Sequence, residues 1–84
     1  MPTYYKRTWD EPLGAWGTSN WYFEVDADGW VLRQLEVYAT GPTLRYDETH
    51  QEDEHGGRAL IPLSGEEFAP YEITAADFEA AWTA

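Results

Sequence analysis

Runs of alternating apolar and polar residues predict β-strands through most of the chain. β-Branched and aromatic residues dominate these runs, whereas glycine, proline, serine and asparagine separate them. Trp16 stands apart because it lies inside the loop formed by residues 10–20. The predicted strands cover residues 3–9, 21–26, 30–39 and 42–47, and residues 58–62 are expected to form a short strand at a sheet edge.

The clearest pattern is a β-hairpin around the segment Ala-Asp-Gly, for which two registers are open. A two-residue Asp-Gly turn pairs Phe23 with Gln34 and mixes apolar and polar side chains on one face. A three-residue loop with Gly29 in the left-handed conformation pairs Phe23 with Arg33. We predict the second register because it separates the two kinds of side chain. Its apolar face consists of Trp21, Phe23, Val25, Val31, Leu35 and Val37.

A second tight turn at Thr40 and Gly41 continues this hairpin into a third strand. With these two residues as the loop, the apolar face is extended by the new strand. On the opposite face Glu36 comes to lie across from Arg45, and such a cross-strand ion pair contributes a few tenths of a kcal/mol. The agreement of the two turns predicts a three-stranded meander.

The C-terminal residues have the pattern of a capped helix over residues 75–82. Thr74 is placed to accept a hydrogen bond from the backbone of Asp77, and Phe78 and Trp82 share one helical face. Eight residues are too few for a stable isolated helix, so we expect this face to dock on the apolar face of the sheet. The predicted fold class is α+β, with an antiparallel meander of three to five strands and one short C-terminal helix packed on one face.

Chain length and composition predict a single domain, residues 1–84, that is held together by packing. A domain of this size buries roughly 60% of the surface that its unfolded chain exposes. There is no cysteine for a disulfide or a thiolate metal site, but aromatic residues make up 17% of the chain. Each can bury about 150–250 Å², which explains how so short a chain can hold a fold.

Sixteen acidic and five basic residues give a formal net charge of −11. This charge argues against nucleic acid or an anionic membrane as the partner, because both are recognised through clustered lysine and arginine. It favours a basic protein, whose association would be fast and sensitive to salt. The N-terminus lacks the apolar core of a signal peptide and no apolar run approaches the ~20 residues of a membrane span, so we expect a cytoplasmic protein.

The chain carries no recognisable catalytic motif. Cysteine, the Gly-x-Ser-x-Gly nucleophile motif and the phosphate-binding glycine loop are all missing from the sequence. His50 and His55 flank an acidic segment, but their spacing matches no established metal-ligand motif. We therefore expect no catalytic residues, no cofactor, no metal and no enzymatic activity.

Aromatic residues beyond those needed for the core predict a binding surface on the reverse face of the hairpin. An apolar patch rimmed by charge marks an interface, and tryptophan and tyrosine are frequent interface anchors. The alternative is that this face is covered by Trp9, by the loop of residues 10–20 or by the segment of residues 58–71. The predicted partner-binding residues are Trp16, Tyr22, Trp30, Leu32, Tyr38, Glu24 and Glu36.

The order of several motifs resembles a known family. Trp-Asp-Glu-Pro lies at residues 9–12, Asp-Gly-Trp at 28–30, Gly-Gly-Arg-Ala-Leu at 56–60, and a Phe-x-x-x-Trp helix ends at Trp82. Together they resemble a family of small, acidic bacterial proteins of unknown function, over residues 9–82. The resemblance implies no catalytic residues. By analogy of size and charge, it suggests an immunity or antitoxin protein.

Two functions follow as hypotheses. The first is a non-enzymatic protein-binding module, an immunity- or antitoxin-type inhibitor of a basic partner. The alternative is a small-molecule-binding or sensor domain with an aromatic-lined pocket. A third possibility is a homodimer formed through the aromatic reverse face of the hairpin. Such a dimer would not by itself define a molecular function.

Overall fold

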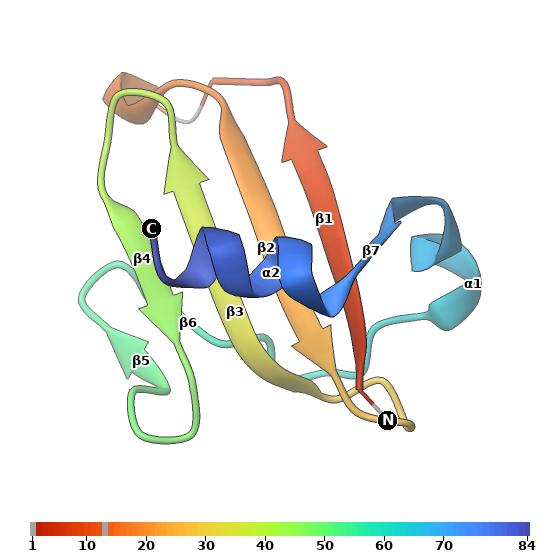
Figure 1. Ribbon diagram of the computed structural model, residues 1–84. Helices are drawn as coiled ribbons and strands as arrows, with labels where there is room; N and C mark the ends of the chain where they lie inside the picture. Colours follow the sequence, from red (N-terminus) through yellow and green to blue (C-terminus); the bar gives the residue numbers. More distant parts are fainter. Residues whose placement is uncertain (1, 13) are drawn as a thin grey trace.

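Four consecutive strands form an antiparallel meander in the computed structural model, which describes residues 2–12 and 14–84 (Figure 1). The strands are β1 (Thr3–Trp9), β2 (Ser19–Val25), β3 (Val31–Tyr38) and β4 (Thr43–Tyr46). A two-residue strand, β7 (Glu72–Ile73), pairs with the start of β1, so the order across the sheet is β4-β3-β2-β1-β7. The predicted α+β fold with an antiparallel sheet is confirmed.

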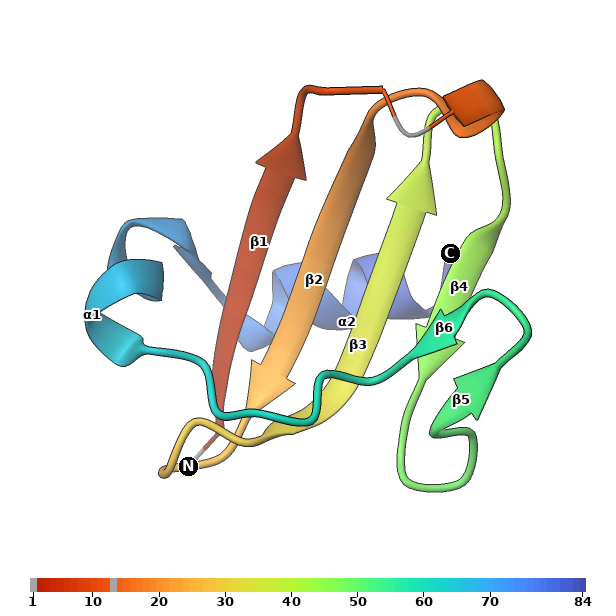
Figure 2. The same cartoon turned by 180° about the vertical axis from the view of Figure 1, so that it is seen from behind.

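Short elements lie on both sides of this sheet. They are the 3₁₀ helices η1 (Gly14–Trp16) and η2 (Ala69–Tyr71), the helices α1 (Gly65–Phe68) and α2 (Ala75–Trp82), and a small hairpin of β5 (Glu52–Asp53) and β6 (Gly56–Gly57). The helix α2 crosses one face, and the chain between β6 and α1 crosses the other (Figures 1 and 2). The edge strand predicted at residues 58–62 is wrong, since this segment is irregular. Within the described chain, no helix has the length and apolar character needed to cross a bilayer.

The hairpin of β2 and β3 follows the predicted register only at its turn. Val25 pairs with Val31, as expected for the three-residue loop. A β-bulge next to Val25 then shifts the pairing by one residue, so that Phe23 faces Gln34 and not Arg33. Beyond the bulge the predicted register is therefore wrong, and each later residue of β3 lies on the opposite face from the one predicted.

The shift is possible because both faces of the sheet are covered. We call the face under α2 the helix face and its reverse the far face. Leu35 and Val37 lie on the helix face, whereas Gln34 and Glu36 are buried on the far face. A hydrogen bond of 2.8 Å joins the Gln34 amide to the Glu36 carboxylate, which removes the main cost of burying these polar groups.

The turn between β3 and β4 is also offset by one residue from the prediction. Glu36 pairs with Leu44, so the predicted ion pair between Glu36 and Arg45 is not formed. Arg45 instead donates hydrogen bonds to the backbone oxygens of Trp82 and Ala84, at 2.8 and 2.7 Å. A positively charged side chain at the end of α2 is favourable because the unpaired carbonyl groups of a helix C-terminus carry partial negative charge.

The C-terminal helix forms where the sequence predicts it. Thr74 caps it by accepting a hydrogen bond of 3.1 Å from the backbone N–H of Asp77, and the rings of Phe78 and Trp82 stack 5.9 Å apart. Phe78 is completely buried and lies 5.3 Å from the ring of Tyr4 on the helix face. The helix therefore docks on the face opposite to Trp21 and Phe23, contrary to the prediction that it covers them.

The burial of two leucines of β3 predicts very different costs for their replacement. Leu35 is completely buried and Leu32 is 39% exposed. We expect Leu35→Ala to lower the free energy of unfolding by about 2–5 kcal/mol and Leu32→Ala by less than about 1 kcal/mol. Urea unfolding followed by tryptophan fluorescence measures both values. Equal losses in the two variants would contradict the observed difference in burial.

Candidate functional site

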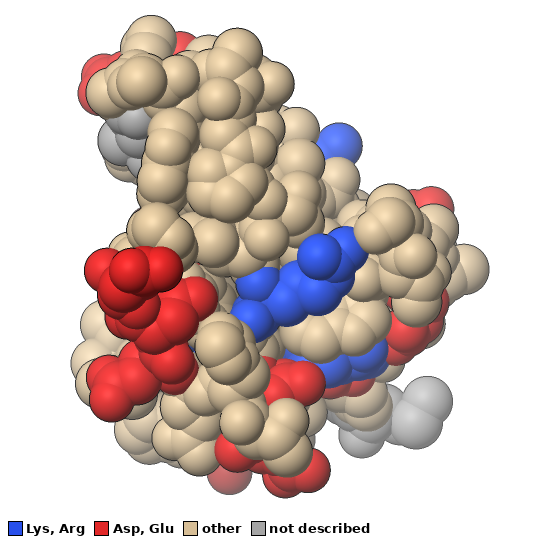
Figure 3. Space-filling model, turned by 90° about the vertical axis from the view of Figure 1, so that its left-hand side faces the viewer, with Lys and Arg blue, Asp and Glu red and all other residues tan. Residues whose placement is uncertain are grey.

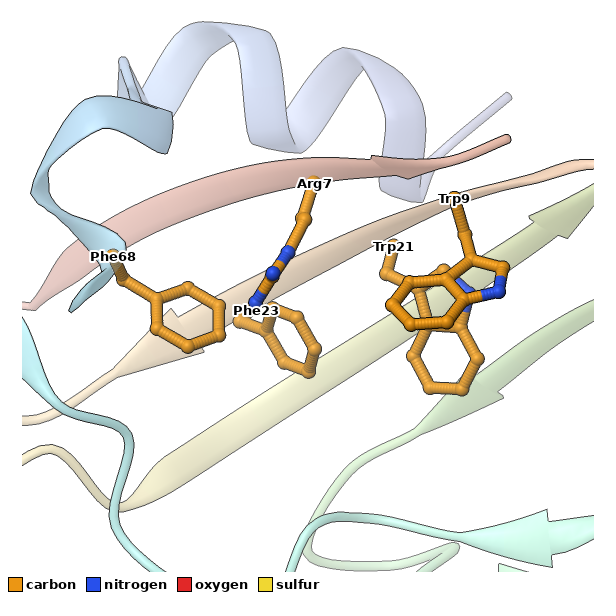
Figure 4. Close-up of a pocket in the computed structure, with 5 residues that line it drawn as sticks. All are labelled: Arg7, Trp9, Trp21, Phe23 and Phe68. Carbon is orange, nitrogen blue, oxygen red and sulfur yellow. The ribbon is translucent and has the colours of Figure 1, made fainter. Parts of the chain in front are cut away.

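An aromatic hollow of about 450 Å³ opens on the far face of the sheet, over β1 and β2 (Figure 4). Figure 4 shows Phe68 at one end and the two tryptophans at the other, with Arg7 and Phe23 between them. Nearly all of the lining is apolar, and the Arg7 guanidinium supplies its formal charge. The aromatic hollow is lined by Arg7, Trp9, Trp21, Phe23 and Phe68.

Strand alternation and one short helix assemble this lining. Arg7 and Trp21 are partners across the β1–β2 ladder, and the next residues on the same face are Trp9 and Phe23. Phe68 arrives from α1, and its ring meets that of Phe23 edge to face at 5.9 Å. Edge-to-face packing of this kind stabilises aromatic pairs beyond their burial. Residues from the two ends of the chain therefore meet at one surface.

The two tryptophans differ in how firmly they are held. The Trp21 indole N–H donates a hydrogen bond of 2.8 Å to the hydroxyl of Ser19, which is buried. This bond fixes the orientation of the Trp21 ring. Trp9 is 43% exposed, although it lines the same hollow. Trp9 thus offers apolar surface that a bound group could cover, since aromatic surface of this size is a frequent interface anchor.

Arg7 brings positive charge to the rim of the aromatic hollow. Its guanidinium lies 5.5 Å from the ring centre of Phe68 and 5.2 Å from that of Tyr71, both within the range of cation–π attraction. A carboxylate oxygen of Glu67 lies 3.6 Å from the Arg7 guanidinium nitrogen. Glu67 is exposed and Arg7 is half-buried, so solvent screens this ion pair and it contributes little to stability. Arg7 can therefore also meet a bound anion.

A buried polar network occupies the other half of the far face. The Tyr38 hydroxyl donates to the Glu36 carboxylate at 2.5 Å, and the Gln34 amide oxygen accepts a bond of 2.8 Å from the backbone N–H of Ala59. The Gln34 amide nitrogen also donates to the backbone oxygen of Gly57 at 3.3 Å. These bonds tie residues 57–59 to the sheet, and they explain why polar side chains can be buried here.

The phenols of this network stay protonated at neutral pH. Burial and the hydrogen bond to Asp53 raise the pKa of Tyr46 to about 12. Burial, followed by the hydrogen bond to Glu36, also raises the pKa of Tyr38. Both hydroxyl groups therefore act as hydrogen-bond donors to carboxylates. Their arrangement accounts for structure and requires no acid–base chemistry.

The seven predicted partner-binding residues do not form one surface. Tyr38 and Glu36 are buried on the far face, where the ring of Trp16 packs 4.9 Å from that of Tyr38. Tyr22 and Glu24 lie on the helix face instead. The prediction that the hairpin residues among them share a face is wrong, because it rested on the register that the β-bulge overturns.

Trp16 serves the fold at the edge of the sheet. Its backbone oxygen accepts a bond of 2.9 Å from Thr40, and a side-chain carbon added at Gly41 would lie 2.5 Å from its ring. Trp30 and Leu32 are solvent-exposed, at 47% and 39%. For all seven residues the predicted role in partner binding stays a prediction.

None of the five residues that line the aromatic hollow was predicted from the sequence as a binding residue, since Trp21 and Phe23 were assigned to the core. Arg7 and Trp9 were placed on one side of a strand, but nothing local identified β2 as the neighbour of that strand. Phe68 comes from a segment that carries no strong pattern. If the pairing of β1 with β2 were known, Arg7 would be placed opposite Trp21. The β1 and β2 residues of the aromatic hollow could then be predicted.

The two histidines lie near the β5–β6 hairpin. His50 Nε2 is 3.3 Å from an oxygen of Asp53, and the His50 ring stacks 5.7 Å from that of Tyr46. The His55 ring meets that of Trp16 edge to face at 5.3 Å. In the described chain, no three His, Asp or Glu side chains come together as a group that could hold a metal ion.

The basic residues are engaged within the protein. Arg33, for example, forms ion pairs with Glu24 on β2 and Glu79 on α2, and its guanidinium lies 4.7 Å from the ring centre of Phe78. Lys6 lies 5.6 Å from the ring centre of Tyr22. Seen from the side of β4, basic side chains form a band with acidic groups around it (Figure 3). Most of the acidic charge is therefore left to face solvent.

Comparison of the chain with models of protein families, with curated proteins and with solved structures finds no match. The resemblance described from the sequence motifs therefore stays a prediction. Function has to be argued from the site itself.

The ion pair between Glu24 and Arg33 predicts a pH-dependent contribution to stability. The hydrogen bond from Arg33 holds the pKa of the Glu24 carboxyl below its ordinary value. A lowered folded-state pKa adds stability above the unfolded pKa of about 4.3, and this contribution is lost as the pH falls through the folded pKa. We expect Glu24→Gln to lose about 1–2 kcal/mol at neutral pH and the difference from wild type to shrink in acid.

Urea unfolding at a series of pH values measures this difference. The control is Glu66→Gln, which removes an exposed acid for which the described chain shows no ion pair. Its difference from wild type should stay small at every pH. A Glu24→Gln deficit that is unchanged in acid would contradict the proposed origin of the stability.

Proposed function

We propose that the protein is a non-enzymatic binding module that receives a large apolar side chain of a protein partner in the aromatic hollow. The support for this proposal is the exposed apolar surface between Trp9, Trp21 and Phe68, in a small domain whose other aromatic rings are mostly packed. Aromatic anchors in a concave site are typical of interface hot spots. The surrounding polar network has structural partners of its own, whereas the apolar lining of the hollow is concave and open to a bound group.

The net negative charge of the protein favours a basic partner. The net charge of −11 would draw a basic protein toward this surface and would make the association fast at low salt. Burial of an apolar side chain in the aromatic hollow would then hold the complex together, because contacts desolvated at the centre of an interface dominate its affinity. Inhibition of a basic partner, as immunity and antitoxin proteins perform it, is the role that we propose for such binding.

Two exposed tryptophans provide a matched test of this proposal. Trp9 lines the aromatic hollow and is 43% exposed, whereas Trp30 lies outside it and is 47% exposed. Tagged wild-type protein should retain a basic protein from a lysate of its source at low salt and lose it at high salt. We expect Trp9→Ala to weaken retention by about tenfold or more and Trp30→Ala to leave it nearly unchanged.

The opposite order would move the binding surface to the residues predicted from the sequence. Retention that is lost only in Trp30→Ala would show that Trp30 is the anchor and that the aromatic hollow is not used. Retention that is unchanged in both variants, or equal at low and high salt, would contradict the proposed mode of binding. Circular dichroism of each variant checks that the fold is kept.

The size of the aromatic hollow favours a second candidate function, which is the binding of a small molecule. Pockets for such ligands enclose about 300–1,000 Å³, and the volume here is about 450 Å³. Arg7 at the rim would orient a carboxylate, while the aromatic lining would cover a ring. An aromatic carboxylic acid is the ligand class that fits these two features.

Phenylacetate and phenethylamine test this second candidate because they share a ring and differ in the sign of their charge. If the aromatic hollow binds small acids, phenylacetate should shift the amide resonances of β1 and β2 in a saturable manner. Phenethylamine should bind about tenfold more weakly, and Arg7→Gln should abolish the preference. Equal or undetectable binding of both compounds would exclude this function and favour the protein partner.

A further inference from the structure

Half of β1 has an unpaired outer edge next to the aromatic hollow. The strand β7 pairs only with Tyr4 and Tyr5, and no described residue continues this ladder along Lys6–Trp9. Figures 1 and 2 show the upper part of β1 as the open margin of the sheet on both views. The 3₁₀ helix η2 lies against β1 next to β7, and its Tyr71 lies over Arg7. The unpaired part of the edge beyond η2 offers backbone donors and acceptors to another strand.

The hydrogen-bond pattern identifies the backbone groups that face outward. The N–H of Ala39 donates to the oxygen of Thr18 at 2.8 Å, which directs the backbone groups of even-numbered β2 residues toward β3. Odd-numbered β2 residues must then bond to their partners on β1, among them Arg7. The N–H and C=O groups of Lys6 and Thr8 consequently point away from the sheet.

Two hollows adjoin this free edge. Arg7 and Trp9 lie between the free edge and the rest of the aromatic hollow. Diagonal neighbours on adjacent strands lie about 7–8 Å apart, so a long side chain of an added strand can reach past these two residues into the hollow. A smaller hollow of about 240 Å³ lies along the edge itself. It is lined by Arg7, Thr8, Trp9, Asp10, Glu11 and Tyr71.

We propose that β1 accepts an extended segment of a basic partner as an additional strand, bonded to the backbone of Lys6 and Thr8. This inference rests on the proposed function and specifies how the partner binds. One side chain of the segment enters the aromatic hollow, and basic residues beside it meet Asp10 and Glu11. Strand addition gives affinity through main-chain bonds and specificity through alternate side chains.

Charge argues for this occupant over a second copy of the chain. Two copies would each bring a net charge of −11 to the interface and would repel each other. At the free edge, Asp10, Glu11 and Glu67 outnumber Arg7, while Lys6 lies over the ring of Tyr22 on the helix face. A segment carrying lysine or arginine removes this local excess of negative charge.

Substitution of Thr8 separates the backbone contact from the side-chain contacts. Thr8→Pro removes the outward N–H and leaves the ladder to β2 intact, because proline is tolerated where an edge strand faces solvent. Thr8→Val is the matched control, since it keeps the N–H but, like proline, loses the hydroxyl bond of 2.7 Å to Asn20. Neither substitution alters the lining of the aromatic hollow.

The probe is a library of short random peptides displayed on phage and selected in parallel on wild-type protein and on Thr8→Pro. Selection on the wild type should enrich peptides that combine a large apolar residue with lysine or arginine. A synthesised peptide from this set should bind Thr8→Pro at least about tenfold more weakly than Thr8→Val, since the two variants differ in the outward N–H. Its binding should slow the hydrogen exchange of the Lys6 and Thr8 amides in wild-type protein.

The outcomes distinguish this inference from the proposed function. Equal binding to Thr8→Pro and Thr8→Val, or unchanged exchange of the two amides on binding, would overturn strand addition. If Trp9→Ala still weakened binding in that case, the aromatic hollow would remain the site. Failure to enrich any peptide on the wild type would also overturn strand addition. If Thr8→Pro does not fold, N-methylation of the peptide backbone gives the same test. It removes the N–H groups with which the peptide would donate hydrogen bonds to the outward C=O groups of β1.

Discussion

The β-bulge beside Val25 determines which side of the sheet each later residue of β3 faces, because side chains alternate along a strand. It directs Leu35 toward α2 and Glu36 toward the far face. The helix then has an apolar surface on which to dock, and the far face acquires polar groups that must be hydrogen-bonded. Both layers of the structure follow from this one local irregularity.

The far face consequently divides into two parts with different chemistry. Over β3 and β4, Gln34, Glu36 and Tyr38 are bonded to one another and to the chain of residues 57–59, and Trp16 closes the edge. Over β1 and β2 the side chains are aromatic, and α1 contributes a single ring at one end. The polar side chains over β3 and β4 find their hydrogen-bond partners within the protein. The aromatic side chains over β1 and β2 retain apolar surface that is open to solvent.

Local features of this fold could be predicted from the sequence, and features that depend on distant segments could not. Gly29 adopts the expected left-handed conformation, with φ of 91°, and Thr74 caps the helix, because each depends on a few neighbouring residues. The register of β3 depends on whether Gln34 finds hydrogen-bond partners, and two of these are the distant backbone groups of Gly57 and Ala59. The aromatic hollow likewise needs Phe68 beside residues of β1, a contact that no local pattern indicates.

The pairing of β7 with β1 has a consequence for the order of folding. Tyr4 and Ile73 are neighbours in the sheet although almost the whole chain lies between them. The turns of the meander close short loops, whereas this contact must order a long one, and contacts of large sequence separation carry the greater entropic cost. We expect the meander to form first and β7 to join β1 last. Until β7 pairs, the unpaired edge of β1 also includes Tyr4 and Tyr5.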